Sequence, residues 1–157
     1  VNGPCAGISY SYAMACDLVL MAESSYLYQP FVGIGLVPDG GATWLLPHLV
    51  GSKRAYELMA LGEKVSAEKA VEWGLANRVL ADDDFGQTSM AFAQDLSARS
   101  PLALRYAKEA LNFAAAHSLS DTISKEAALQ SICIGSADSK EAITAFFEKR
   151  TPAWKGK

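Results

Sequence analysis

The stretch Phe31–Pro47, FVGIGLVPDGGATWLLP, decides how the rest of the chain is interpreted. Apolar residues on both sides converge on the turn Pro38-Asp39-Gly40-Gly41, and a helical pattern resumes at Ala42. A lone carboxylate in a mostly apolar wall is a typical arrangement for a base that moves a proton at neutral pH. Pro-Asp-Gly is also ordinary turn chemistry, so a plain turn is the competing interpretation. The sequence around the turn has to separate the two.

The composition indicates one globular protein with a real core. The chain has 157 residues, of which 50% are hydrophobic and 20% charged, with a formal net charge of −3. Its 14 basic residues form no stripe with interleaved aromatic residues, which argues against a nucleic-acid partner. No apolar run approaches the roughly 20 residues of a membrane span, so no membrane partner is expected. Cys5, Cys16 and Cys133 share no metal or redox spacing, which favours buried free thiols in a reducing cytoplasm.

The chain opens with a glycine-bearing loop, Val1-Asn2-Gly3-Pro4-Cys5-Ala6-Gly7-Ile8, directly before a helical pattern. Because an opening on Val1-Asn2-Gly3 is typical of a strand end entering a turn, we expect a piece of a longer protein. Free amide hydrogens at a helix start, together with the helix dipole, can stabilise developing negative charge on an oxygen. Every helix has such an end, usually capped or hydrated, so this feature alone leaves the anion site open.

Short strands and helices alternate up to about Leu80. We expect a buried helix over Ile8–Ala15, strands over Leu18–Ala22 and Tyr26–Tyr28, and helices begun by Ser52 and Ser66 and ended by glycine. Such short pieces in this order predict one coil of a repeating sheet spiral.

The remainder of the chain reads as helices only. Asp84 with Gln87 suggests a capping box, Ser100-Pro101 a helix start, and Ser120 and Asp138 are expected to cap the last two helices. The chain therefore divides into a mixed part, 1–80, and a helical part, 81–157.

The ordered motifs resemble those of the enoyl-CoA hydratase/isomerase (crotonase) superfamily over essentially the whole chain. They begin with V-N-G-x-x-x-G and end with A-F-x-E-K-R at Ala145–Arg150. Between them come Cys16-Asp17, Pro30-Phe31, Gly35-Leu36-Val37-Pro38, Gly40-Gly41-Ala42-Thr43, Val50-Gly51, Leu61-Gly62, Ala67-x-x-Ala70 and Trp73-Gly74-Leu75. The resemblance implies a crotonase-like α/β fold, and the chain looks like the family's C-terminal part without its N-terminal portion.

The resemblance places the family's oxyanion donor on the backbone amide of Ile8, which follows Gly7. Hydratases of the family use two glutamates, whose positions fall on Ser11 and Phe31 here. Neither side chain can do acid–base work near pH 7. Asp39 instead falls where the isomerase branch carries its single catalytic carboxylate, and L-x-P-D-x-G-x-T-W-L-L-P resembles the bacterial phenylacetate-degradation isomerases.

Four further positions complete the expected substrate site. Phe31 would be a pocket wall that removes water from Asp39, although plain core packing is equally consistent. Trp44 is expected in the core or in the acyl pocket. Phe146 and Lys149 match positions that contact coenzyme A in the family, and a solvated helix face is the alternative for Lys149.

These inferences predict an α/β, crotonase-like ββα spiral (1–80) followed by an all-helical oligomerisation region (81–157). The expected activity is isomerisation of an acyl-CoA double bond through Asp39, with the coenzyme A thioester as substrate and no metal or redox cofactor. A cytoplasmic homotrimer or dimer of trimers is expected, with a possible role in aromatic (phenylacetate) or fatty acid metabolism. The alternatives are a hydratase-like lyase with altered residues and a non-catalytic acyl-CoA-binding or assembly protein.

Overall fold

A computed structural model describes all residues, 1–157. The chain forms two compact units, an N-terminal unit, Val1–Ala91, and a helical unit, Phe92–Lys157. The sequence suggested a change of character at residue 80, whereas the division found here falls inside helix α5 (Phe85–Ser97). The assignment of separate roles to 1–80 and 81–157 stays a prediction.

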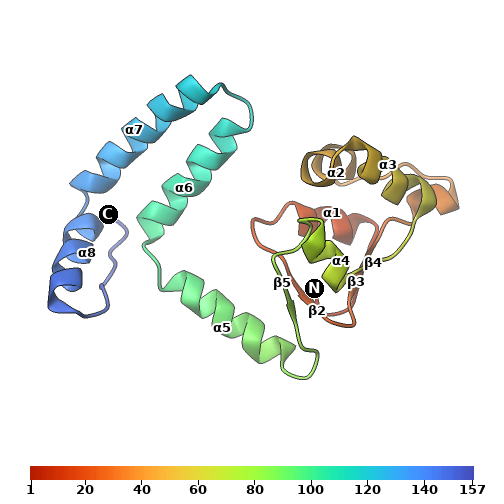
Figure 1. Ribbon diagram of the computed structural model, residues 1–157, viewed down its shortest axis with the longest axis horizontal. Helices are drawn as coiled ribbons and strands as arrows, with labels where there is room; N and C mark the ends of the chain where they lie inside the picture. Colours follow the sequence, from red (N-terminus) through yellow and green to blue (C-terminus); the bar gives the residue numbers. More distant parts are fainter. The chain divides into compact units, whose positions relative to one another are not determined.

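Two small sheets form the centre of the N-terminal unit (Figure 1). Strand β3 (Tyr26–Tyr28) pairs in parallel with β1 (Pro4–Ala6) and antiparallel with β4 (Val65–Ser66). Strand β2 (Leu20–Ala22) pairs in parallel with β5 (Arg78–Leu80). Parallel neighbours need a crossover connection, and helix α1 (Ile8–Met14) lies in the one between β1 and β3.

Helices pack against these sheets and complete the core of the N-terminal unit. After β3 come the short 3₁₀ helix η1 (Phe31–Ile34), α2 (Ala42–Val50) and α3 (Ser52–Leu61), and α4 (Ala67–Glu72) follows β4. The most buried large hydrophobic side chains are those of Tyr10, Met21, Leu27, Leu46 and Val65. The core therefore contains side chains from α1, α2 and the strands β2, β3 and β4. It holds the start of α1 close to the start of α2.

The sequence predicted that helix α1 is buried. The prediction holds for one face of the helix and is wrong for the other. Tyr10, Ser11 and Met14 are buried, whereas Ile8 and Tyr12 are exposed. The buried side chains cover one face of the helix, on the side of β1 and α2. The opposite face, which begins at Ile8, is open.

The helical unit consists of the end of α5 and three further helices, α6 (Pro101–Ala114), α7 (Leu119–Gly135) and α8 (Ala137–Glu148). Helices α6 and α7 run antiparallel, side by side (Figure 1). No helix anywhere in the chain combines the length and the apolar character needed to cross a membrane.

The predicted helix caps are partly confirmed. The side-chain oxygens of Ser66 and Ser100 each accept a hydrogen bond, at 3.3 Å, from a backbone amide in the first turn of α4 and α6. Ser52 is not a cap, because α3 begins on it and Gly51 occupies the capping position. A glycine before the helix thus replaces the side-chain cap that the sequence suggested.

The caps predicted for the last two helices, Ser120 and Asp138, are wrong by two residues. Ser118 caps α7, accepting from the amide of Asp121 at 3.2 Å, and Ser136 caps α8. The Ser118 hydroxyl also donates to the Asp121 carboxylate at 2.6 Å, which makes the earlier serine the better cap. Closely spaced serines and acids gave two plausible helix starts in each case.

Asp138 is buried and holds the C-terminal tail against α8. Its carboxylate, 2% exposed, accepts hydrogen bonds from the amide of Lys155 at 2.7 Å and the amide of Gly156 at 3.1 Å. The hydroxyl of Ser100 donates to the same carboxylate at 3.4 Å. One buried charge therefore connects the start of α6, the start of α8 and the tail.

Replacing Asp138 by alanine should lower the free energy of unfolding by about 2–3 kcal/mol, because the hydrogen bonds to this charged group are lost and the tail amides are left unpaired. Denaturant unfolding measures the change. Asp83→Ala, which removes an exposed carboxylate, is the matched control and should stay within about 0.5 kcal/mol of wild type. Equal stability of Asp138→Ala and wild type would contradict the role given to this carboxylate.

Candidate functional site

The structure brings α1 and the turn Pro38–Gly41 into direct contact. The hydroxyl of Ser11 donates a hydrogen bond to the backbone carbonyl of Asp39 at 2.8 Å. Ser11 is fully buried, so water does not compete for this bond. The bond ties the middle of α1 to the turn that carries the predicted catalytic residue.

Gly40 allows this contact because it lacks a side chain. Its φ of +60° is a left-handed conformation, and a Cβ atom there would lie 3.0 Å from both Ile8 Cγ1 and Ser11 Cβ. Real Cβ atoms essentially never approach other atoms more closely, so α1 and the turn pack as tightly as glycine permits. Ile8 and Asp39 are therefore held on neighbouring stretches of backbone.

The start of α1 carries backbone amides that no side chain caps. Gly7 occupies the capping position without a side-chain hydrogen bond to the helix, and its own amide donates to the carbonyl of Tyr28 at 2.9 Å. Strand β3 thereby holds the helix start in place. Ile8 is the first helical residue, and the first amides of a helix have no partner within it, which leaves its amide available to an external acceptor.

Phe31 lies beside the same helix start. The end of its ring is 3.5 Å from the position that a Cβ atom of Gly7 would take. Phe31 opens η1, a 3₁₀ turn that the sequence did not predict, and its carbonyl accepts from the amide of Leu36 at 2.9 Å. Gly7, Ile8, Phe31 and the Asp39 backbone therefore form one cluster.

Asp39 is exposed, and the expectation that Phe31 removes water from it is wrong for this chain. The ring of Phe31 contacts the Gly7 position, and Phe31 itself is only half-buried. The apolar residues next to the turn, such as Val37 and Trp44, are exposed as well. The Asp39 carboxylate is therefore open to solvent, and the apolar residues that flank it in the sequence are exposed with it.

Trp44 is a surface residue, so the core interpretation of this position is wrong. Its side chain is 61% exposed and stacks on the ring of His48 at a centroid distance of 4.2 Å. His48 Nδ1 lies 2.6 Å from the carbonyl oxygen of Trp44, one helical turn earlier in α2. The stacked pair forms an exposed aromatic surface on α2.

Phe146 and Lys149 belong to the end of α8 in the helical unit. Phe146 is 78% exposed and meets Phe147 edge to face at 5.7 Å. Lys149 is exposed and ends α8 in a left-handed conformation. The neighbouring Arg150 pairs with Glu141, and this hydrogen-bonded ion pair lowers the pKa of the Glu141 carboxyl to about 2. Both predicted coenzyme A residues are accessible at a helix end held by that pair.

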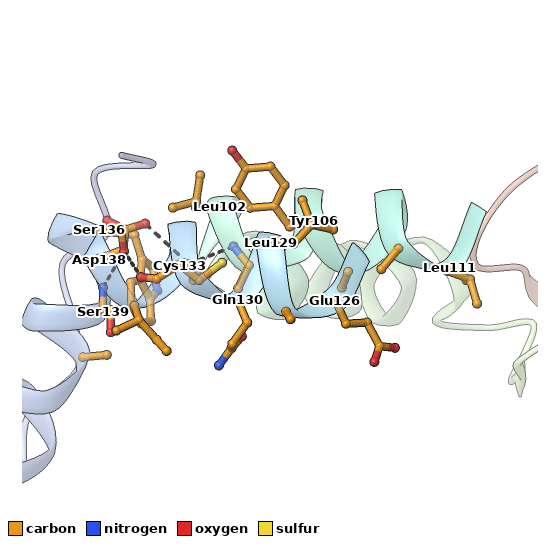
Figure 2. A pocket seen from close by; sticks show the side chains of 18 of the residues that line it. Leu102, Tyr106, Leu111, Glu126, Leu129, Gln130, Cys133, Ser136, Asp138 and Ser139 are labelled. Atoms are coloured by element: carbon orange, nitrogen blue, oxygen red, sulfur yellow. Dashed lines mark hydrogen bonds between the residues drawn. The ribbon is translucent and has the colours of Figure 1, made fainter. Parts of the chain in front are cut away.

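Sequence reasoning missed a large apolar cavity along α6 and α7 in the helical unit (Figure 2). It has a volume of about 1050 Å³. Tyr106, Leu111 and Ile134 line it, together with small residues such as Ala107 and Ala110. The alanines on one side of α6 were the available signal, since small side chains on facing helices leave space between them.

Gly40→Ala should destabilise the protein more than Gly35→Ala. Both glycines have a positive φ, +60° and +74°, so both substitutions strain the backbone. Only at position 40 does the new methyl group meet Ile8 and Ser11, which adds about 1–3 kcal/mol of overpacking. Chemical denaturation of the two variants gives the difference, and equal losses of stability would show that the turn does not pack tightly on α1.

Comparison with known proteins places this arrangement in a family. The family model described as enoyl-CoA hydratase/isomerase matches residues 1–157. The chain is 37% identical over its whole length to the 1,2-epoxyphenylacetyl-CoA isomerase of Escherichia coli K12, and 38% identical to a probable enoyl-CoA hydratase of Rhodobacter capsulatus. It covers 60% and 61% of these two proteins, so it spans about three fifths of the length of the relatives it matches.

Solved structures agree with the sequence relatives. An enoyl-CoA hydratase from Polaromonas sp. JS666 superimposes with a TM-score of 0.93 at 34% identity, over 98% of this chain and 60% of that one. The fold is therefore the crotonase-like α/β fold. With the family model matching from the first residue to the last, the chain belongs to the enoyl-CoA hydratase/isomerase family.

Proposed function

We propose that the protein is an acyl-CoA isomerase that shifts a carbon–carbon double bond by proton transfer through Asp39. The observation that carries the proposal is the contact between α1 and the turn Pro38–Gly41, closed by the Ser11–Asp39 hydrogen bond. It keeps a carboxylate-bearing residue beside the uncapped amide of Ile8. A base and an amide donor near one another are the two groups that the reaction needs.

The proposed reaction is a proton shuttle. Asp39 takes a proton from the carbon next to the thioester of a 3-enoyl-CoA, and the electron pair moves onto the thioester oxygen. The amide of Ile8 donates a hydrogen bond to that oxygen and stabilises its negative charge. The carboxyl group returns the proton two carbons further along, the oxygen gives back its electron pair, and the 2-enoyl-CoA leaves without any other reactant.

Addition of water is the weaker candidate. It needs one group to deliver a proton and another to orient the water, and the family's two glutamate positions hold Ser11 and Phe31. The only hydroxyl hydrogen of Ser11 is donated to the Asp39 carbonyl, and Phe31 has no proton to transfer. The names of the relatives include both isomerase and hydratase, so the site residues carry this choice.

Binding of substrate would supply the dry surroundings that Asp39 lacks in the open chain. An acyl group that lies over Val37 and the Trp44–His48 pair covers apolar surface and expels water from the carboxylate. An epoxide substrate, of the kind for which the E. coli relative is named, would use Asp39 differently, to position or protonate the ring oxygen. Phenylacetate breakdown is one pathway in which such a substrate occurs.

For the coenzyme A moiety we propose Phe146 and Lys149. An exposed ring can stack on adenine, and an exposed ammonium group can pair with phosphate. No metal or redox group takes part in the proposed reaction, and coenzyme A enters only as part of the substrate.

The helical unit is proposed to hold copies of the chain together, as a trimer or a dimer of trimers. Its surface carries large apolar side chains that the unit itself does not bury, among them Leu111, Leu119, Ile134 and Phe147. Exposed apolar surface of this extent typically marks a protein–protein contact.

Replacing Asp39 by asparagine should lower the rate of double-bond shift by about 10²–10⁴-fold, because the amide cannot accept the proton. Conversion of a 3-enoyl-CoA to the conjugated 2-enoyl-CoA, followed by absorbance, measures the rate. Binding of the thioester should be unchanged. Asp83→Asn, which alters an exposed acid away from the turn, should behave as wild type.

Three outcomes would contradict the proposal. Full activity of Asp39→Asn excludes the proton shuttle. Release of a 3-hydroxyacyl-CoA, detected by mass, identifies a hydratase instead. Binding of acyl-CoA without any turnover by the wild-type protein identifies a non-catalytic binding protein.

Leu111→Asp should reduce the oligomeric mass of the protein, because a charge would be buried in the proposed contact. Asn112→Asp adds the same charge at the next residue of α6, outside the cavity, and should leave the mass unchanged. Sedimentation velocity distinguishes the species. A monomeric wild-type protein, or two variants that behave alike, would exclude this surface as the contact.

A further inference from the structure

We propose that Ser11 is a positioning residue, which fixes the backbone of Asp39 for proton transfer; this inference rests on the function proposed above. Ser11 and Asp39 lie 28 residues apart in the sequence and are joined by a hydrogen bond of 2.8 Å. The serine is 0% exposed. This buried hydrogen bond fixes the turn that carries Asp39 against α1.

The chemistry of the hydroxyl rules out a more direct role. A serine has one hydrogen to donate, and this one goes to the Asp39 carbonyl oxygen. To act as a nucleophile or to orient water, Ser11 would have to break that bond and reach solvent from a fully buried position. Ser11 therefore acts on the reaction only through Asp39.

The carbonyl of Asp39 is held from two sides. The Ser11 hydroxyl donates to it from α1, and the amide of Ala42, the first residue of α2, donates to it at 3.1 Å. Ala42 is itself buried. With both lone pairs of the carbonyl engaged, the peptide that follows Asp39 is tied to two helices at once.

Contact at Gly40 closes the arrangement. The position of its missing Cβ lies 3.0 Å from Ser11 Cβ, so the turn cannot approach α1 more closely. The hydrogen bond prevents it from moving away. The backbone of Asp39 is thereby held on its carbonyl side, and the exposed carboxylate extends from a point next to Ile8. Proton transfer is sensitive to such placement, since displacement by about 1 Å can cost 10²-fold in rate.

Loss of the hydroxyl should therefore affect turnover more than binding. For Ser11→Ala we expect kcat for the 3-enoyl-CoA to fall by about tenfold with KM unchanged, because one hydrogen bond at the turn is lost. Ser11→Cys replaces the hydroxyl by a somewhat larger thiol, which is a much weaker donor, and should fall similarly. Ser11→Thr keeps the hydroxyl but adds a methyl group to the tight contact with Gly40, so it should retain more of the wild-type kcat than Ser11→Ala.

The decisive experiment is a double-mutant cycle of Ser11→Ala with Asp39→Asn in the full-length protein, with a 3-enoyl-CoA as substrate and circular dichroism as the test of folding. Because Ser11 acts through the carboxylate, Ser11→Ala should not lower the residual rate of Asp39→Asn any further. If Ser11→Ala does not fold, Ser11→Cys takes its place in the cycle.

The results separate the two proposals. Wild-type kcat in Ser11→Ala and Ser11→Cys, or losses that multiply in the double variant, would overturn the positioning role while the Asp39 mechanism stands. A tenfold loss of kcat shared by both donor-poor variants, smaller in Ser11→Thr and absent on the Asp39→Asn background, supports it. A wild-type protein that does not shift the double bond overturns the function first and the positioning role with it.

Discussion

The hydrogen bond from Ser11 to the carbonyl of Asp39 is the constraint on which the site depends. It joins a helix whose first amides are uncapped to a turn that carries a carboxylate, and the close approach at Gly40 keeps the two in contact. Without it, the core of the N-terminal unit would still place α1 and α2 near each other. The position of Asp39 relative to Ile8 would then depend on the Ala42 hydrogen bond and the packing at Gly40 alone.

The same hydrogen bond suggests a structural role for Ser11, which falls on a position where the hydratases of the family carry a glutamate. Where the resemblance expects a catalytic glutamate, Ser11 is buried and holds the backbone of Asp39, the proposed base, which lies on another segment. The exposed position of Asp39 fits a base that becomes shielded only when an acyl chain covers the apolar residues beside it. The fold thus acts on the proposed chemistry through two main-chain groups, the carbonyl of Asp39 and the amide of Ile8.

The sequence predicted those elements that depend on a few adjacent residues, such as a short strand or a helix cap. Strand β3 was predicted at Tyr26–Tyr28, and Ser100 before a proline at the start of α6, because each depends on a few adjacent residues. The caps of α7 and α8 were misplaced because several serines compete within one turn. The exposure of Asp39 depends on which segments, distant in the sequence, pack over it, and this packing cannot be predicted from the adjacent residues.

The most direct test is a crystal structure of the full-length protein with a non-reactive thioester-like analogue of a 3-enoyl-CoA. The account predicts the amide nitrogen of Ile8 at about 2.7–3.1 Å from the oxygen that mimics the enolate. It also predicts the Asp39 carboxylate next to the carbon that loses its proton, with the Ser11 bond intact. An analogue held elsewhere, or an Asp39 side chain turned to bulk water in that complex, would contradict the account.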